Sequence, residues 1–196
     1  MNLKAIAGAA LFAMLLASVS VVATTTLPGW MMAGDKAGSY MMATEPVANS
    51  DGGNIAYLKS KKESVEGFGT MMQMFSAQQY VGKRVKVSAS LRSQNVKGWA
   101  GLWLRVDGDK GSILAFDNMQ DRPIKGTTDW KQYDVVLDVS ENASRLAMGV
   151  VMADGGQVWV DKFKIEIVPN TVPITGTGTG KMAAPTGPKN LEFKPN

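Results

Sequence analysis

Two tryptophans and an arginine lie along one short segment of the sequence, and together these residue types can hold a sugar. In residues 99–106, Trp99, Trp103 and Arg105 alternate with aliphatic residues. Side chains two positions apart in a strand point to the same side of a sheet, so these three are predicted to share one face. The apolar C–H face of a sugar ring stacks on an indole, while a guanidinium group hydrogen-bonds its hydroxyls. The alternative is that one or both indoles pack beneath a loop as part of the core.

A polar loop supplies further candidate ligand-binding residues. Within six positions it holds Asp117, Asn118, Gln120, Asp121 and Arg122. These groups could hydrogen-bond the hydroxyls of a ligand, provided that they are open to solvent. They could equally form an internal network that fixes the loop, with Arg105 or Arg122 pairing with Asp117 or Asp121.

The absence of cysteine and histidine from all 196 residues excludes many kinds of site. Cysteine nucleophiles, Ser-His-Asp triads, zinc sites built on histidine or cysteine, and disulfides are all ruled out. Paired carboxylates remain as hydrolytic groups, and the candidates are Asp107, Asp109, Asp117, Asp121 and Asp129. Most of them lie in predicted turns, where aspartate is common for structural reasons. The composition therefore favours a protein that binds a ligand over an enzyme.

Methionine is abundant, and its 13 residues include the neighbouring pairs 31–32, 41–42 and 71–72. Thioethers bind Cu(I), which raises the idea of a copper site. Neighbouring residues in a strand point to opposite faces, however, so these pairs do not converge on one ion. Core packing explains the methionines better.

The net charge of +4 is small, and the basic residues are spread along the chain. The densest group, Lys59, Lys61 and Lys62, is followed at once by Glu63 and Glu66, which is typical of a solvated surface. Nucleic-acid binding needs a basic stripe or patch, so no nucleic-acid partner is predicted.

The first 23 residues have the pattern of a secretory signal peptide. Lys4 precedes an apolar run from Ala5 to Val22, and Ala23 completes a small-residue cleavage motif. We therefore expect a periplasmic or secreted protein whose mature chain begins at Thr24. An uncleaved membrane anchor is the alternative, because the run is near the length that spans a bilayer. No later segment is long and apolar enough to cross a membrane, so no span is expected after cleavage.

Short strands account for most of the chain that follows. A period of two in hydrophobicity marks residues 84–92, 99–106 and 131–139 as strands with one buried face. Further strands are predicted around 30–44 and at 55–60, 68–75, 113–116, 145–152 and 158–168, with residues 117–129 as a polar loop. Regular short strands without crossover helices favour an all-β fold. We expect residues 24–168 to form one antiparallel β-sandwich, a jelly roll of about nine strands.

The composition changes after residue 168. Residues 169–196 hold five of the eight prolines and a Thr-Gly repeat at 175–180, which predicts a flexible tail or linker. Near the end of the chain, Leu191 and Phe193 form a small apolar cluster that could dock as an edge strand.

Several motifs in the middle of the sequence resemble those of galactose-binding-like jelly rolls. They are Gly67-Phe68-Gly69-Thr70, Gly98-Trp99-Ala100-Gly101-Leu102-Trp103, Phe116–Ile124, Gly126–Trp130 and the closing Val158-Trp159-Val160-Asp161. The closing motif is similar to the last strand of many carbohydrate-binding modules. The middle motifs resemble a little-characterised family of such domains, found alone in exported bacterial proteins or fused to transcriptional regulators. Residues 190–193 resemble a segment that leads into a further domain in relatives.

The resemblance implies a jelly roll and suggests one metal ligand. In similar sandwiches, an acid at the position of Asp161 helps to hold a structural calcium ion, for which Asp35 or Asp51 are candidate partners. No other cofactor is expected.

Because this fold hosts sugar binding, protein binding and structural roles, function depends on the site. The Trp99, Trp103 and Arg105 face beside the loop at 117–122 predicts an exported, non-catalytic binding module with a carbohydrate as its favoured ligand. The alternative is a protein-interaction or structural domain of the cell envelope, with an envelope protein as its partner.

Overall fold

The computed structural model describes residues 27–46 and 54–178. The signal peptide predicted for residues 1–23 lies outside these ranges, as do Asp51, Leu191 and Phe193. Among the residues that the structure describes, no helix has the length and apolar character needed to cross a bilayer.

Strands make up most of the described chain, and every strand pairing is antiparallel. The strands are β1 (Met31–Ala33), β2 (Tyr40–Pro46), β3 (Asn54–Ser60), β4 (Phe68–Ser76), β5 (Arg84–Gly108), β6 (Ile113–Asp117), β7 (Ile124–Asp138), β8 (Ala143–Ala153), β9 (Gln157–Val168) and β10 (Thr177–Gly178). Two 3₁₀ turns, Ala37–Ser39 and Asp109–Gly111, complete the described elements. The predicted all-β jelly-roll sandwich is confirmed.

Strand β5 is continuous over 25 residues, although the sequence predicts two separate strands there. Its first half pairs with β7 and β9, and its second half pairs with β8 and β6. Between the halves the register to β7 shifts three times, and Asn95 adopts a left-handed φ of 53°, which asparagine tolerates better than most residues. These irregularities bend the strand, so that β5 belongs to both layers of the sandwich.

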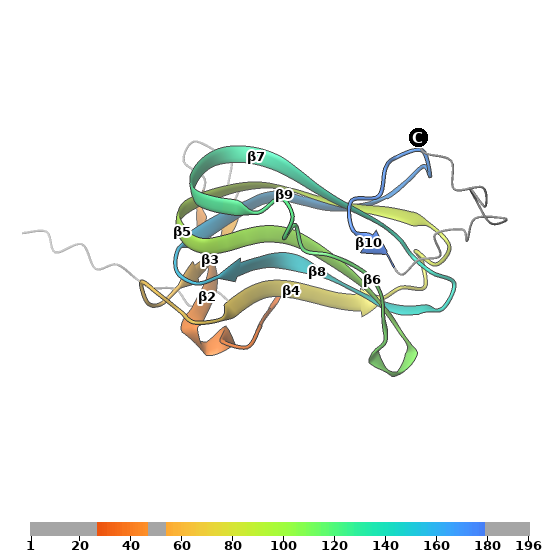
Figure 1. Cartoon of the computed structure of the whole chain (residues 1–196), viewed down its shortest axis with the longest axis horizontal. Helices are drawn as coiled ribbons and strands as arrows, with labels where there is room; N and C mark the ends of the chain where they lie inside the picture. The colour runs from red at the N-terminus through yellow and green to blue at the C-terminus, as the bar shows by residue number, and fades with distance from the viewer. Residues whose placement is uncertain (1–26, 47–53, 179–196) are drawn as a thin grey trace, which may run out of the picture.

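The two layers are named here by their central strands. The β4–β8 layer has the order β1, β4, β8, second half of β5, β6 and β10. The β3–β9 layer has the order β2, β3, β9, first half of β5 and β7. Figure 1 shows β4, β5, β7 and β8 running along the long axis of the molecule, with β7 above β5 and β4 below β8 in this view.

The core lies between the layers and is built from the two alternating runs of β5. The aliphatic residues at 85, 87, 89 and 91 in the first half and at 100, 102, 104 and 106 in the second half are all 0% exposed. They form one cluster with inward side chains of β3, β7, β8 and β9. The alternation read from the sequence is therefore confirmed, and it puts Trp99 and Trp103 on the outer face of the β4–β8 layer.

One loop is shorter than predicted. The sequence suggests a loop over residues 117–129, but β7 begins at Ile124, directly after Pro123. Ile124 is buried opposite Ala100 of β5, which fixes the start of the strand. Residues 125–130 are exposed or half-buried along one edge of the layer, so they lack the alternating buried positions that mark a strand in the sequence.

The first part of the segment beyond Val168 contacts the sandwich. Arg84 donates hydrogen bonds to the carbonyls of Asn170 and Val172 at 2.5 and 2.6 Å. Strand β10 pairs with β6, as Figure 1 shows. Residues 179–196, the rest of the predicted flexible tail, lie outside the described residues.

Candidate functional site

A cleft of about 310 Å³ opens on the outer face of the β4–β8 layer. Three of its lining residues, Trp99, Trp103 and Arg105, come from the second half of β5. Phe68 enters from β4 and Phe116 from β6, while Asn118 follows β6. The cleft therefore contains the aromatic and cationic face predicted from the sequence, together with two phenylalanines that the prediction missed.

Trp103 forms the floor of the cleft and is only 6% exposed. Its indole Nε1–H donates to the hydroxyl of Thr70 on β4 at 2.8 Å, and that hydroxyl donates to the carbonyl of Val150 at 2.9 Å. The indole reaches β4 by crossing β8 at Gly149, the residue paired with Trp103, where no side chain intervenes. This indole is therefore packed, as the alternative interpretation allowed, but against Met72, Ala147 and Val151 of β4 and β8 rather than beneath a loop.

The walls of the cleft are more open than its floor. Trp99 is partly buried against a small apolar cluster that includes Trp103, Met72 and Val151. Phe68 is 40% exposed and Phe116 is 37% exposed. The rings of Phe116 and Trp103 meet edge to face, with their centroids 6.4 Å apart. Trp99, Phe68 and Phe116 are thus the aromatic rings that a bound ligand can reach.

Arg105 is held in place by a buried carboxylate. Its Nε and Nη2 donate to the two oxygens of Asp107 at 2.8 and 2.9 Å. The Asp107 side chain is 3% exposed, whereas that of Arg105 is 31% exposed and lines the cleft. This bidentate pair fixes the guanidinium plane and leaves its outer edge free to donate hydrogen bonds to a ligand.

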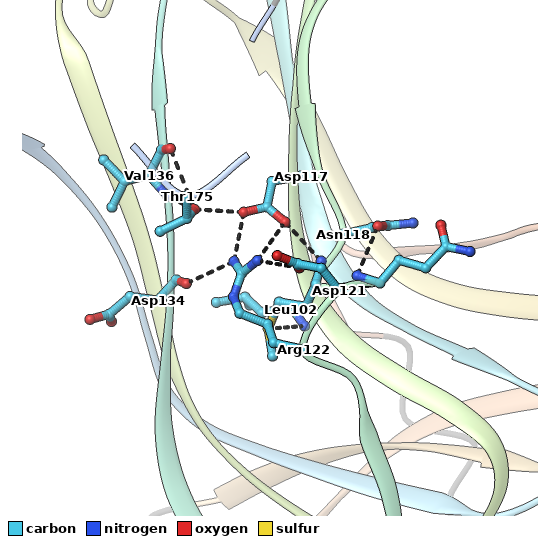
Figure 2. A network of polar contacts seen from close by, with 10 residues as sticks. Leu102, Asp117, Asn118, Asp121, Arg122, Asp134, Val136 and Thr175 are labelled. Atoms are coloured by element: carbon cyan, nitrogen blue, oxygen red, sulfur yellow. Dashed lines mark hydrogen bonds and ion pairs between the residues drawn. The ribbon is translucent and has the colours of Figure 1, made fainter. Parts of the chain in front are cut away.

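The loop after β6 forms an internal network around Asp117 (Figure 2). Arg122 donates to both carboxylate oxygens of Asp117, at 3.2 and 2.6 Å. Thr175, from the segment beyond β9, donates to the same carboxylate at 2.5 Å, and the backbone N–H of Met119 donates at 2.8 Å. Arg122 also bonds Asp121 at 2.8 Å. Of the pairings considered from the sequence, those of Arg122 with Asp117 and Asp121 are present.

The electrostatics of Asp117 agree with a structural role. Burial alone would raise the pKa of this carboxyl group, but the hydrogen bonds from Arg122, Thr175 and Met119 outweigh that effect and lower it. The side chain is 4% exposed and its acceptor positions are taken. Asp117 and Arg122 therefore fix the loop. The burial of Asp117 leaves its carboxylate little access to a ligand, whereas the Arg122 side chain is 33% exposed and its role in ligand binding stays a prediction.

The other polar residues of the loop divide between two surfaces. Asn118 lines the cleft, and its Oδ1 accepts the N–H of Gln120 at 3.2 Å. Gln120 and Asp121 are exposed and line an adjoining hollow, which shares Phe116 and Asn118 with the cleft. Only Asn118 is thus brought together with the tryptophans.

The sequence gives no signal that would put Thr70, Phe68 and Phe116 beside the two tryptophans. Phe68 and Thr70 alternate along β4, which predicts a shared face. The pairing of β4 with β8 rather than with β5 is a long-range contact with no local signal.

The predicted metal ligand Asp161 lies on β9, where its Oδ1 accepts the N–H of Lys162 at 2.7 Å. Asp35 accepts the N–H of Phe68 at 2.7 Å. Residues 27–46 and 54–178 bring together no group of three or more acidic side chains around an ion position. Calcium at Asp161 therefore stays a prediction.

No family model matches the sequence. A curated relative from Bacillus subtilis (strain 168), described as the uncharacterized HTH-type transcriptional regulator YbfP, is 39% identical over 150 residues. The match covers 76% of this chain and 51% of the relative, so the chain spans about half the length of the curated relative it matches.

Two solved structures illustrate the similarity of fold. The enzymatically active domain of tailspike protein 4 from bacteriophage CBA120 matches with a TM-score of 0.54 and 11% identity, over 72% of this chain and 20% of that one. A Clostridium thermocellum xylanase 10B structure, containing CBM22-1 and GH10 modules with xylohexaose, matches with a TM-score of 0.52 and 12% identity. That match covers 75% of this chain and 27% of the other. At these identities the similarity concerns the fold alone, which is that of a jelly-roll β-sandwich.

Proposed function

We propose that this chain is an exported, non-catalytic carbohydrate-binding module and that its ligand binds in the cleft of the β4–β8 layer. The observation that carries the proposal is the cleft itself, where Trp99, Phe68 and Phe116 surround two oriented polar groups, Arg105 and Asn118. Partly exposed aromatic rings beside fixed hydrogen-bond donors are the combination that sugar recognition needs.

Each group in the cleft has a distinct task in this proposal. The rings of Trp99 and Phe116 offer apolar surface for the C–H face of a sugar. Arg105, held by Asp107, donates to sugar hydroxyls from a fixed position, so little side-chain entropy is lost on binding. Asn118 supplies both a donor and an acceptor. Trp103 supports the site from below, because its own N–H is already bonded to Thr70.

The non-catalytic part of the proposal is supported by the chemistry of the lining. None of the residues that line the cleft carries a carboxylate. Hydrolysis of a glycosidic bond ordinarily uses two carboxyl groups that flank it. Asp107 and Asp117, two of the carboxylates considered from the sequence, are buried in ion pairs with Arg105 and Arg122.

The similarity of fold to a xylanase structure that contains a CBM22-1 module lends support to a glycan ligand. Export rests on the pattern of residues 1–23, and a periplasmic or secreted location is part of the same proposal.

Binding of the whole mature chain to a glycan panel that includes xylohexaose tests the proposal, with affinities measured by calorimetry. Trp99→Ala and Phe116→Ala are expected to weaken binding on the order of tenfold or more, since each removes a stacking surface. Ile167→Ala is the matched control, because Ile167 is 54% exposed on β9, in the opposite layer.

Trp103→Ala is a poor test, because loss of the buried indole would disturb the fold as well as the site. Circular dichroism and thermal unfolding confirm that the chosen variants remain folded. Absence of binding to every glycan, or equal binding by the cleft variants and Ile167→Ala, contradicts the proposal.

A further inference from the structure

On the outer face of the β3–β9 layer, one arginine lies between two tryptophans. Arg92 of β5 places its guanidinium carbon 4.0 Å from the ring centroid of Trp159 on β9 and 5.5 Å from that of Trp130 on β7. Trp159 is 8% exposed, whereas Trp130 is 42% exposed. The stack therefore presents one open indole beside a cationic plane.

The positive charge of Arg92 has only one distant carboxylate near it in the described chain. Its nearest carboxylate oxygen in the described chain, Oε1 of Glu45, is 3.9 Å away and already accepts the indole N–H of Trp159 at 2.8 Å. Within residues 27–46 and 54–178, the buried Nε of Arg92 has no hydrogen-bond acceptor. The side chain is 38% exposed, so its outer N–H groups are open to an anionic ligand.

A polar pocket of about 670 Å³ adjoins the stack. On β9, Trp159 pairs with Arg92 and Gln157 pairs with Gln94, while Lys59 of β3 lies opposite Gln157. Gln157, Gln94 and Lys59 all line the pocket. Two residues of strand span about 7 Å, so the stack and the pocket form one continuous surface.

The pocket carries an excess of positive charge. Its lining includes Lys59, Lys61, Lys62 and Lys97 but only one acid, Glu63. Lys97 pairs with Glu63 at 2.7 Å, and Lys61 donates to a backbone carbonyl at 2.9 Å. In the described part of the chain, neither Lys59 nor Lys62 has a carboxylate oxygen within 4.0 Å. Among the described residues, two ammonium groups at one end of the surface therefore have no carboxylate partner.

The wall of the pocket is fixed by hydrogen bonds between β5 and β7. The backbone N–H of Asn95, at its left-handed φ, donates to the hydroxyl of Thr127 at 3.1 Å. The hydroxyl of Ser93 donates to the carbonyl of Gly126 at 3.0 Å. A wall held in this way needs little ordering when a ligand binds.

We propose that this surface, defined by Trp130, Arg92, Lys59 and Lys62, binds acidic polysaccharides built from uronate sugars. The C–H face of a pyranose ring stacks on Trp130, and the ring carboxylate accepts hydrogen bonds from Arg92. Lys59 and Lys62 neutralise the carboxylate of a neighbouring unit. A phosphate polymer without sugar rings gains nothing from the indole, and a neutral glycan leaves the lysines unmatched. The surface lies in the opposite layer from the cleft and does not depend on the function proposed for it.

Titration of the whole mature chain with polygalacturonate tests this inference. The matched probe is the same polymer with its carboxylates methyl-esterified. We expect polygalacturonate to bind, with affinity that falls as salt rises, and the esterified polymer to bind at least tenfold more weakly. Trp130→Ala and the double variant Lys59→Gln/Lys62→Gln should each weaken binding on the order of tenfold.

The double variant Lys83→Gln/Lys110→Gln is the charge-matched control, because both lysines are exposed and outside the pocket lining. Equal loss in this control, or equal binding of polyphosphate and polygalacturonate, would mean non-specific attraction of anions and would overturn the proposal. Equal binding of the esterified polymer would overturn it as well. Thermal unfolding verifies that each variant is folded.

Discussion

The indole N–H of Trp103 on β5 donates to the hydroxyl of Thr70 on β4 at 2.8 Å, although β8 lies between these strands. Gly149 of β8 makes this contact feasible. A Cβ atom there would collide with the carbonyl oxygen of Met71, so the backbones of β4 and β8 approach closely at this point. Together with the bond from the Thr70 hydroxyl to the carbonyl of Val150 on β8, the Trp103–Thr70 bond joins three strands beneath the cleft and fixes the floor on which the exposed rings rest.

Thr70→Val is therefore expected to lower the free energy of unfolding by about 2 kcal/mol, because it leaves a buried indole N–H without an acceptor. Valine has nearly the same shape as threonine, so the loss reports on the hydrogen bond rather than on packing. Thr70→Ser keeps the hydroxyl, so its free energy of unfolding should fall by less than that of Thr70→Val. Denaturant unfolding of the three proteins checks this order, and equal stability of the valine and wild-type proteins would contradict it.

A second stability prediction concerns the acid side of the pH profile. Asp117 has a lowered pKa in the folded chain, so its ionised form contributes stability above its unfolded pKa, and that contribution is lost as pH falls through the folded value. We expect Asp117→Asn to be less stable than wild type at pH 7 by about 2 kcal/mol. The difference should shrink as the pH falls below about 4.

Denaturant unfolding from pH 7 to pH 2 measures this difference. Asp121→Asn is the matched control, because its carboxylate also bonds Arg122 but its side chain is 73% exposed. The control should change stability little. A difference between Asp117→Asn and wild type that stays constant down to pH 2 would be inconsistent with the network seen in Figure 2.

Local alternation was sufficient to predict the core and the face that Trp99 and Trp103 share. It could not predict that Trp103 is buried, because its cover comes from β4, which is far away in sequence and separated from it by β8. The start of β7 was missed for a related reason. Its first half is mostly exposed along the edge of a layer, so Ile124 is an isolated buried residue in an otherwise polar stretch.

In the polar loop after β6, residue type alone was not enough to predict which side chains are open to a ligand. Asp117, Asn118 and Gln120 all have side chains that could bind a sugar, but only burial distinguishes them. Thr175, which donates to Asp117, lies in a segment that composition assigned to a tail. The network was thus not predictable in full from the loop alone.

We predict that residues beyond Val168 contribute to the stability of the domain. A chain ending at Val168 loses the Thr175 donor to Asp117 and the carbonyls of Asn170 and Val172 that accept from Arg84. We expect it to be less stable by 2 kcal/mol or more, on the order of one or two hydrogen bonds to charged groups. A chain ending at Gly178 keeps these contacts and should match the stability of the whole mature chain. Thermal and denaturant unfolding of the two truncated chains and the whole mature chain measures this difference. Equal stability of the two truncated chains would contradict the prediction.

The last prediction concerns Tyr40, whose ring lies beneath Gly69 of β4. Its hydroxyl donates to the carbonyls of Asp154 and Gly67 at 2.9 and 3.2 Å. Burial, together with the nearby charges of Asp154 and Asp35, raises the pKa of Tyr40 to about 12. Because the folded pKa exceeds the unfolded value of 10.0, the stability linked to this proton is present below pH 10 and is lost as pH rises toward 12.

Tyr40→Phe should therefore cost about 1 kcal/mol at pH 7, through the lost hydrogen bonds, yet show a shallower loss of stability between pH 10 and 12. Ultraviolet absorbance follows the ionisation of each tyrosine to tyrosinate. The titration step near pH 12 should be present in the wild-type protein and absent from Tyr40→Phe. Tyr57→Phe, on the outer face of β3, is the control for the loss of one chromophore. A tyrosinate signal from Tyr40 near pH 10 would show that its hydroxyl is not held by the carbonyls of Asp154 and Gly67 in solution.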